Sequence, residues 1–219
     1  MKKVLILFVC FLGLNFPTAE ALAIAKIHPD LEAEYLHYLD LVKKNPQDPL
    51  AHYNLSITCA YIGRVEEAWN ELKIINKLDK NYAVQAISIF SKKVRQNPSD
   101  WKARFRLAFA YYFYKEKNAQ EKAYLELEKI AKMEPIGAKN AWAYGYMAVM
   151  DGKKENWEEA IKLCKKALEI EPEAAAINFA LGQAYLKTGH SIKATYRILR
   201  ALRLRWLERV FGPKLSRNG

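Results

Sequence analysis

The sequence contains little glycine, proline and cysteine. Of its 219 residues, 9 are glycine, 8 are proline and 3 are cysteine. So little glycine and proline argues against collagen-like, low-complexity and many-turned all-β structures, and three cysteines are too few for a disulfide scaffold. Acidic residues are also fewer than basic ones. The chain has 24 Asp and Glu and 35 Lys and Arg, which gives a net charge of +11. Since 51% of the residues are hydrophobic, the chain can still fold, as one domain or as one elongated repeat array.

Motifs of catalysis and metal binding are missing as well. No H-E-x-x-H, G-x-S-x-G, C-x-x-C or phosphate-binding Gly-rich loop occurs. The four histidines are scattered, at His28, His37, His52 and His190. The acidic pairs at 66–67 and 158–159 are interpreted as first-turn residues of helices, where carboxylates favour the positive end of the helix dipole. We therefore expect no enzyme activity, no cofactor, no metal site and no small-molecule substrate.

Residues 1–23 have the pattern of a secretory signal peptide. A basic start at residues 2–3 precedes an apolar run, Val4–Phe16, and A-x-A sequences follow at 19–21 and 21–23. The run is shorter than the roughly 20 apolar residues that a bilayer-spanning helix needs. We expect cleavage near residue 21 or 23 and a periplasmic or secreted protein. The alternative is an uncleaved anchor that holds the protein in the membrane, facing the periplasm. We expect Cys59 and Cys164 to be buried thiols too far apart for a disulfide.

A repeat of about 34 residues organises the rest of the chain. Similar tripeptides end in Pro46, Pro98, Pro135 and Pro172, at spacings of 52, 37 and 37 residues. These spacings fit units of 34 residues, with one insertion of 18 residues and two insertions of 3 residues between them. The last unit, 175–208, carries Leu181, Gly182, Tyr185, Ala194 and Ala201 at the expected intervals.

This pattern resembles the tetratricopeptide repeat (TPR) family, whose signature is W-x₂-L-G-x₂-Y, then A-x₃-F and a proline. Unit 141–174 directly precedes the last unit in phase, with Trp157, Ala160 and Pro172 at matching places. Weaker matches are 101–140, which has an insertion, and 49–82, which lacks the terminal proline. Asp151 occupies the position where the family pattern has tyrosine. We therefore expect the first helix of unit 141–174 to end a turn early.

The resemblance implies an all-α fold, a right-handed α-solenoid of TPR-like helix-turn-helix repeats. Gly63 and Gly189 fall at turns, where positive φ favours glycine. Outside the repeats we expect an N-terminal helix in 24–48, as a degenerate half repeat, and an extra helix in 83–100. The last helix, about 191–210, is expected to cap the array, before a basic tail at 209–219.

The resemblance also implies a concave groove lined by the first helix of each unit. Its positions are rich in aromatic residues, which dominate interface hot spots. Our candidate partner-binding residues are Tyr53, Phe105, Phe109, Tyr112, Tyr146 and Phe179. The alternative is that several of them pack between helices. The groove lacks the Lys and Asn of the carboxylate-clamp members, so an apolar peptide or helix fits it better than an acidic tail.

The positive charge is concentrated at the C-terminus, where residues 187–219 carry nine basic residues and one acidic residue. Candidate basic-surface residues are Lys193, Arg197, Arg200 and Arg203. Leu199, Leu202, Trp206 and Val210 lie on the opposite face of the helix from the first three. This helix is interpreted as a solvated outer face, as a contact with an anionic membrane surface or as a dock for an acidic protein. A nucleic-acid partner is not expected, since no base-reading motif is visible.

Together these features predict an exported TPR scaffold or adaptor that binds a protein or peptide in an aromatic groove, for assembly of an envelope complex. The alternative is a membrane-surface tether or spacer. It would be held by the N-terminal segment or by the basic C-terminal helix.

Overall fold

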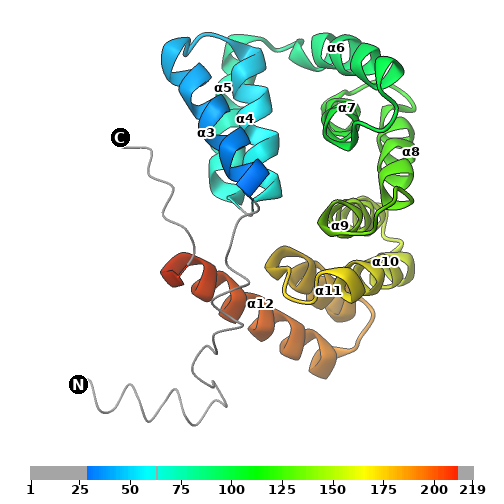
Figure 1. Ribbon diagram of the computed structural model, residues 1–219. Coiled ribbons are helices and arrows are strands. Elements are labelled where there is room, and N and C mark those ends of the chain that lie inside the picture. Colours follow the sequence, from blue (N-terminus) through cyan, green and yellow to red (C-terminus); the bar gives the residue numbers. More distant parts are fainter. Residues whose placement is uncertain (1–28, 63, 212–219) are drawn as a thin grey trace, which may run out of the picture.

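The computed structural model describes residues 29–62 and 64–211 (Figure 1). The predicted signal peptide, the turn at Gly63 and most of the predicted basic tail lie outside the described residues. Within the described ranges the chain forms ten helices and no strand: α3 (Pro29–Lys44), α4 (Pro49–Tyr61), α5 (Val65–Leu78), α6 (Tyr82–Gln96), α7 (Trp101–Phe113), α8 (Ala119–Ala131), α9 (Ala138–Lys153), α10 (Trp157–Ile170), α11 (Ala175–Lys187) and α12 (Ser191–Phe211). The predicted all-α fold is confirmed. None of these helices is long and apolar enough to span a bilayer.

Helices α4 and α5, α7 and α8, α9 and α10, and α11 and α12 pack as pairs. The pairs from α7 to α12 follow one another in space, and the first helices α9 and α11 also touch. Figure 1 shows the helices following a curved path from the group α3–α5 through α6–α8 to α12. Both extra helices expected from the sequence are present, as α3 and α6.

Helix boundaries follow from local chemistry. The Asp48 side chain caps α4 by accepting a hydrogen bond from the Leu50 amide at 2.8 Å, and Asp100 caps α7 through the Ala103 amide at 2.9 Å. Gly189 ends the turn after α11 with φ of 78°, a conformation that costs glycine little. The chain can therefore reverse between α11 and α12 over very few residues.

Helix α9 is longer than predicted. It runs through Asp151 to Lys153, so the expectation of an early end at Asp151 is wrong. The Asp151 carboxylate is buried but partnered, because it accepts a hydrogen bond from the Tyr124 hydroxyl of α8 at 3.0 Å. This interaction lets an aspartate take the place of the family's tyrosine without breaking the helix.

The C-terminal pairs are joined by small side chains that allow close approach. A Cβ at Gly182 of α11 would lie 2.7 Å from Cγ1 of Ile198 and 3.3 Å from the backbone oxygen of Ala194 in α12. Ala194 is itself buried in this contact region. The α11–α12 contact is therefore close-packed and apolar, as the small residues of the repeat pattern predict.

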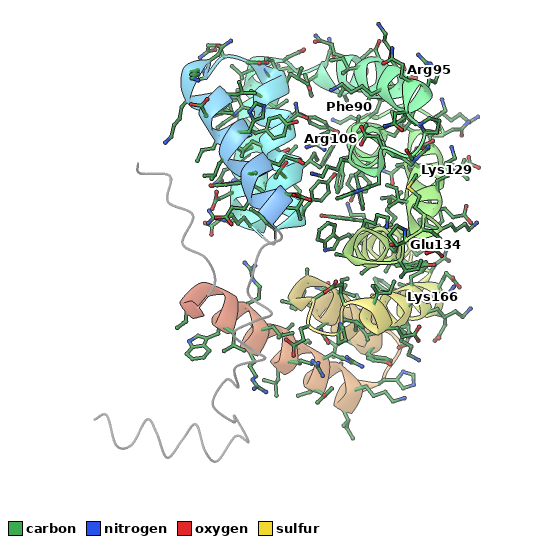
Figure 2. All side chains as sticks on the ribbon, viewed as in Figure 1. Phe90, Arg95, Arg106, Lys129, Glu134 and Lys166 are labelled. Carbon is green, nitrogen blue, oxygen red and sulfur yellow. The ribbon has the colours of Figure 1, made fainter. Side chains whose placement is uncertain are left out.

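The N-terminal helices are joined differently, through a buried arginine. Arg106 of α7 lies between α4 and α7 (Figure 2) and is only 4% exposed. Its guanidinium donates to Asn54 Oδ1 at 2.7 Å and to Glu34 Oε1 at 2.5 Å, so it ties α7 to both α4 and α3. In return, the Tyr53 hydroxyl donates to the Arg106 carbonyl at 2.5 Å. A charged network therefore connects α3 and α4 to the rest of the array.

Extra helix α6 packs against α7 and fills the space beside α4 with aromatic rings. Tyr82 and Phe90 are buried, with ring centroids 5.1 and 5.7 Å from that of Tyr53. Helix α6 thus acts as a spacer between the first repeat pair and the later ones.

Candidate partner-binding surface

An aromatic cluster joins three first helices of the array, α4, α7 and α9. The ring of Tyr61 is stacked on that of Trp142, with centroids 5.4 Å apart and planes at 9°. Trp101 contacts Tyr61, Trp142 and Phe105, at 5.6, 6.2 and 6.0 Å. Each such pair adds roughly 0.5–1.5 kcal/mol beyond area burial. The cluster therefore fixes the relative positions of the first helices.

The aromatic run continues along α7 and α9. The Phe109 ring stands edge-on to Tyr146, with centroids 4.6 Å apart, and is 6.3 Å from the ring of Phe113. Tyr112 contacts Phe113 at 5.2 Å, and its hydroxyl accepts a hydrogen bond from Lys153 Nζ. These half-buried rings leave part of their faces accessible.

Two of the predicted groove residues are corrected by the structure. Tyr53 and Phe105 are buried, at 2% and 0% exposure, and cannot present their side chains to a partner. Helix α6 covers Tyr53, whereas Phe105 is enclosed by Tyr61, Trp101, Phe109 and Tyr146. The alternative weighed from the sequence, packing between helices, therefore describes these two.

The other four candidates remain accessible. Phe109, Tyr112 and Tyr146 are half-buried, and Phe179 of α11 is 43% exposed. Their part in partner binding stays a prediction.

Neighbouring residues extend the accessible set. Val149 and Leu186 are exposed and lie seven residues after Trp142 of the aromatic cluster and after Phe179, respectively. Trp101 was missed from the sequence, although a tryptophan directly after the Asp100 cap was a usable signal. We call the following set the inner surface: Trp101, Phe109, Tyr112, Phe113, Trp142, Tyr146, Val149, Phe179 and Leu186.

The inner surface is mainly neutral. Burial raises the pKa of the Tyr146 hydroxyl, so the phenol stays protonated across the physiological range. Burial also raises the pKa of Tyr61, whose buried hydroxyl has no hydrogen-bond partner in the described part of the chain. Neutral aromatic faces favour apolar ligands over charged ones.

The predicted basic surface is divided by the structure. Lys193 and Arg203 of α12 are exposed. Arg197 and Arg200 are half-buried: Arg197 donates to Asn178 Oδ1 at 3.0 Å, and Arg200 donates to the Pro172 carbonyl oxygen at 3.4 Å and to the Tyr196 hydroxyl of its own helix at 3.3 Å. Arg197 and Arg200 thus serve partly to hold α12 in place. The helix therefore does not present a continuous row of solvated cations.

The side chains of Cys164 and His52 are both buried. Burial raises the pKa of the Cys164 thiol to about 12, which suppresses the thiolate. His52 and Glu71 form a buried pair, with Nδ1 and Oε2 2.5 Å apart, and the other ring nitrogen lies 3.0 Å from the Pro46 carbonyl oxygen. This pair joins α4 to α5. Within the described ranges, no three His, Cys, Asp or Glu side chains gather in a group suited to a metal ion.

Comparison with protein families finds one match. A family model described as a TPR repeat matches residues 153–189, which run from the end of α9 to the turn after α11. The match supports the repeat assignment in the two units where the sequence pattern is clearest. No curated protein matches the chain.

Comparison with solved structures finds similar chains. One is TTC0263, titled a thermophilic TPR protein, from Thermus thermophilus. It has 20% sequence identity and a TM-score of 0.50, over 83% of this chain and 90% of that one. Another is MamA residues 41-end from Desulfovibrio magneticus, at 17% identity and a TM-score of 0.46, over 81% and 87%. The chain thus has the all-α solenoid fold of TPR proteins, which the Thermus structure shares.

Proposed function

We propose that this protein is a non-catalytic scaffold that binds an apolar segment of a partner protein on its inner surface. The observation that carries the proposal is the continuity of that surface. Aromatic rings from α7 and α9 touch one another, and α9 contacts α11, which carries the exposed apolar residues Phe179 and Leu186. Such rings supply large contact areas at a small cost in side-chain entropy.

The chemistry of the ligand follows from the chemistry of the surface. The inner surface offers mainly ring faces and aliphatic side chains, with Lys153 at its edge beside Tyr112. An amphipathic helix that lays its apolar face on these rings would match it, in the manner of helix-in-groove recognition. The TPR-type fold adds support, since solenoids commonly use extended concave surfaces for binding.

We further propose that the protein acts after export, in assembly of an envelope complex. This part rests on the signal-peptide pattern at residues 1–23. N-terminal sequencing of protein from fractionated cells tests it. A start near residue 22 or 24, in the periplasmic or secreted fraction, supports export. An intact Met1 in a membrane fraction supports the tether alternative, and an intact Met1 in the cytosol contradicts both.

Binding of selected peptides tests the surface. Peptides are selected from a displayed library on the full chain, and their affinities are measured for a Phe109→Ala and Phe179→Ala double variant. Loss of two hot-spot rings predicts affinity roughly thirtyfold or more weaker. The matched control is Leu125→Ala with Ile136→Ala, which removes two exposed apolar side chains elsewhere. If the control weakens binding as much, or the inner variant does not weaken it, the site assignment fails.

A further inference from the structure

The last helix carries an apolar stripe on the side that faces away from the array. Ile192, Leu199 and Trp206 are spaced seven residues apart. Tyr196, Arg203 and Val210 form a second series with the same spacing, and both series lie on one side of the helix. All five apolar residues are exposed, Ile192 by 88% and Trp206 by 56%. Ala194, Ala201 and Leu204 of the same helix are buried. Helix α12 thus packs on α11 with the side that includes Ala194 and Ile198, and presents the five exposed apolar residues to solvent.

Basic residues surround this stripe. The 21 residues of α12 include six Lys or Arg and one Glu. Exposed Arg203 lies within the stripe, and exposed Lys193 lies beside it. A shallow hollow of about 430 Å³ flanks the start of the stripe, lined by Tyr185, Ile192, Lys193, Tyr196 and Arg197. Apolar and cationic groups are therefore interleaved along about 30 Å of helix.

From this arrangement we propose that α12 is an interfacial membrane helix, which docks the protein on an anionic lipid surface with its apolar stripe among the acyl chains. An amphipathic helix with aromatic and aliphatic residues on one side and Lys and Arg around them is suited to the boundary between headgroups and acyl chains. The cations meet lipid phosphates, and the long Arg203 side chain can reach the headgroups while its stem stays in the apolar layer.

Charge favours a lipid surface over a second copy of this chain. Two copies that packed stripe against stripe would place Arg203 of both in the contact, which is unfavourable for like charges in an interface. An anionic bilayer instead complements Arg203 within the stripe and Lys193 beside it. This site is separate from the inner surface, so lipid docking and partner binding can fail independently.

Vesicle binding tests the proposal on the full chain. Vesicles of phosphatidylcholine alone are compared with vesicles that also contain phosphatidylglycerol, by flotation. Wild-type protein is expected to bind the anionic vesicles, and Lys193→Gln with Arg203→Gln to weaken binding roughly thirtyfold. The matched control, Lys73→Gln with Lys77→Gln, removes the same charge from exposed residues of α5 and should bind as wild type.

Two further variants test insertion of the stripe. Brominated acyl chains are expected to quench part of the tryptophan fluorescence, and this part should be lost in Trp206→Phe. It should be kept in Trp69→Phe, since Trp69 is 55% exposed on α5. Leu199→Asn with Leu202→Asn should also abolish vesicle binding while helicity is unchanged.

Three results would overturn the proposal. The first is binding that survives all α12 variants, which would place membrane attachment elsewhere in the chain. The second is equal binding to neutral and anionic vesicles. The third is no vesicle binding together with a dimer that Leu199→Asn with Leu202→Asn dissociates, which would make the stripe a contact between copies.

Discussion

The two ends of this solenoid are held together by different chemistry. Around α3, α4 and α7, the contacts depend on a buried guanidinium and its partners, Glu34 and Asn54. Around α9 to α12 they depend on alanine and glycine, which let helix backbones approach closely. The TPR family match falls in the second region. Small-residue packing can be repeated from unit to unit, whereas a specific ionic network joins parts that do not fit the repeat.

Removing the arginine should have the largest effect. Arg106→Leu removes one of the two cations that pair with Glu34 and the donor to Asn54, and we expect a loss of about 3 kcal/mol, at the lower end for breaking a buried pair because Lys102 still pairs with Glu34. Urea unfolding measures the loss in free energy of unfolding. Arg95→Leu, on the exposed side of α6 (Figure 2), is the matched control and should change stability by less than about 0.5 kcal/mol. Equal losses in the two variants would show that the network does not hold the N-terminal helices.

A methyl group at the closest helix contact should have the next largest effect. Gly182→Ala places Cβ against Ile198 and the α12 backbone, at a cost of roughly 1–3 kcal/mol, offset by up to about 1 kcal/mol of helix propensity. Thermal unfolding should show a net destabilisation. Gly145→Ala is the comparison, because its Cβ would meet only the side chain of Ile177, at 3.0 Å. It should be nearly neutral, and a Gly182→Ala protein as stable as wild type would contradict the close-packing account.

Lowering the pH should destabilise the N-terminal helices more than the C-terminal ones. We expect this to be the smallest of the three effects, since no side chain is removed. Burial raises the pKa of Glu34, but Arg106, Lys102 and Thr58 outweigh it and hold the pKa below its ordinary value of 4.5. Its contribution to stability is therefore fully present above pH 4.5 and is lost as the pH falls through the lower pKa of the folded state. Hydrogen exchange should report earlier opening of α3 and α4 than of α11 and α12. A Glu34→Gln variant should lose part of this pH dependence, and identical profiles would contradict the assignment.

The sequence predicts the fold well where local and global signals agree. Leu181, Gly182 and Tyr185 occur at family spacing, and the helices they predict are present. The resemblance could not reveal Arg106, because its partners Glu34 and Asn54 are 72 and 52 residues away. A usable signal existed, since an arginine directly between Phe105 and Leu107, two apolar residues of α7, requires a partner if it is buried.

The candidate site was predicted less well than the fold. Family positions indicate which side of a helix faces inward, but burial depends on neighbours that the repeat does not specify. Tyr53 is covered by the extra helix α6, and Phe105 by rings from α4 and α9. In contrast, no later helix follows α11 on its inner side within the described chain, which leaves Phe179 exposed.

Site-specific photocrosslinking in the source cells tests the central claim, that the inner surface binds a partner, most directly. A photoreactive phenylalanine replaces Val149 on the inner surface or Leu125 on α8, two exposed positions of similar accessibility. We predict a discrete crosslinked protein from position 149 that is absent from position 125 and is lost when Phe109→Ala and Phe179→Ala are added. Crosslinks from position 125 alone, or crosslinks from 149 that persist in the double variant, would contradict it.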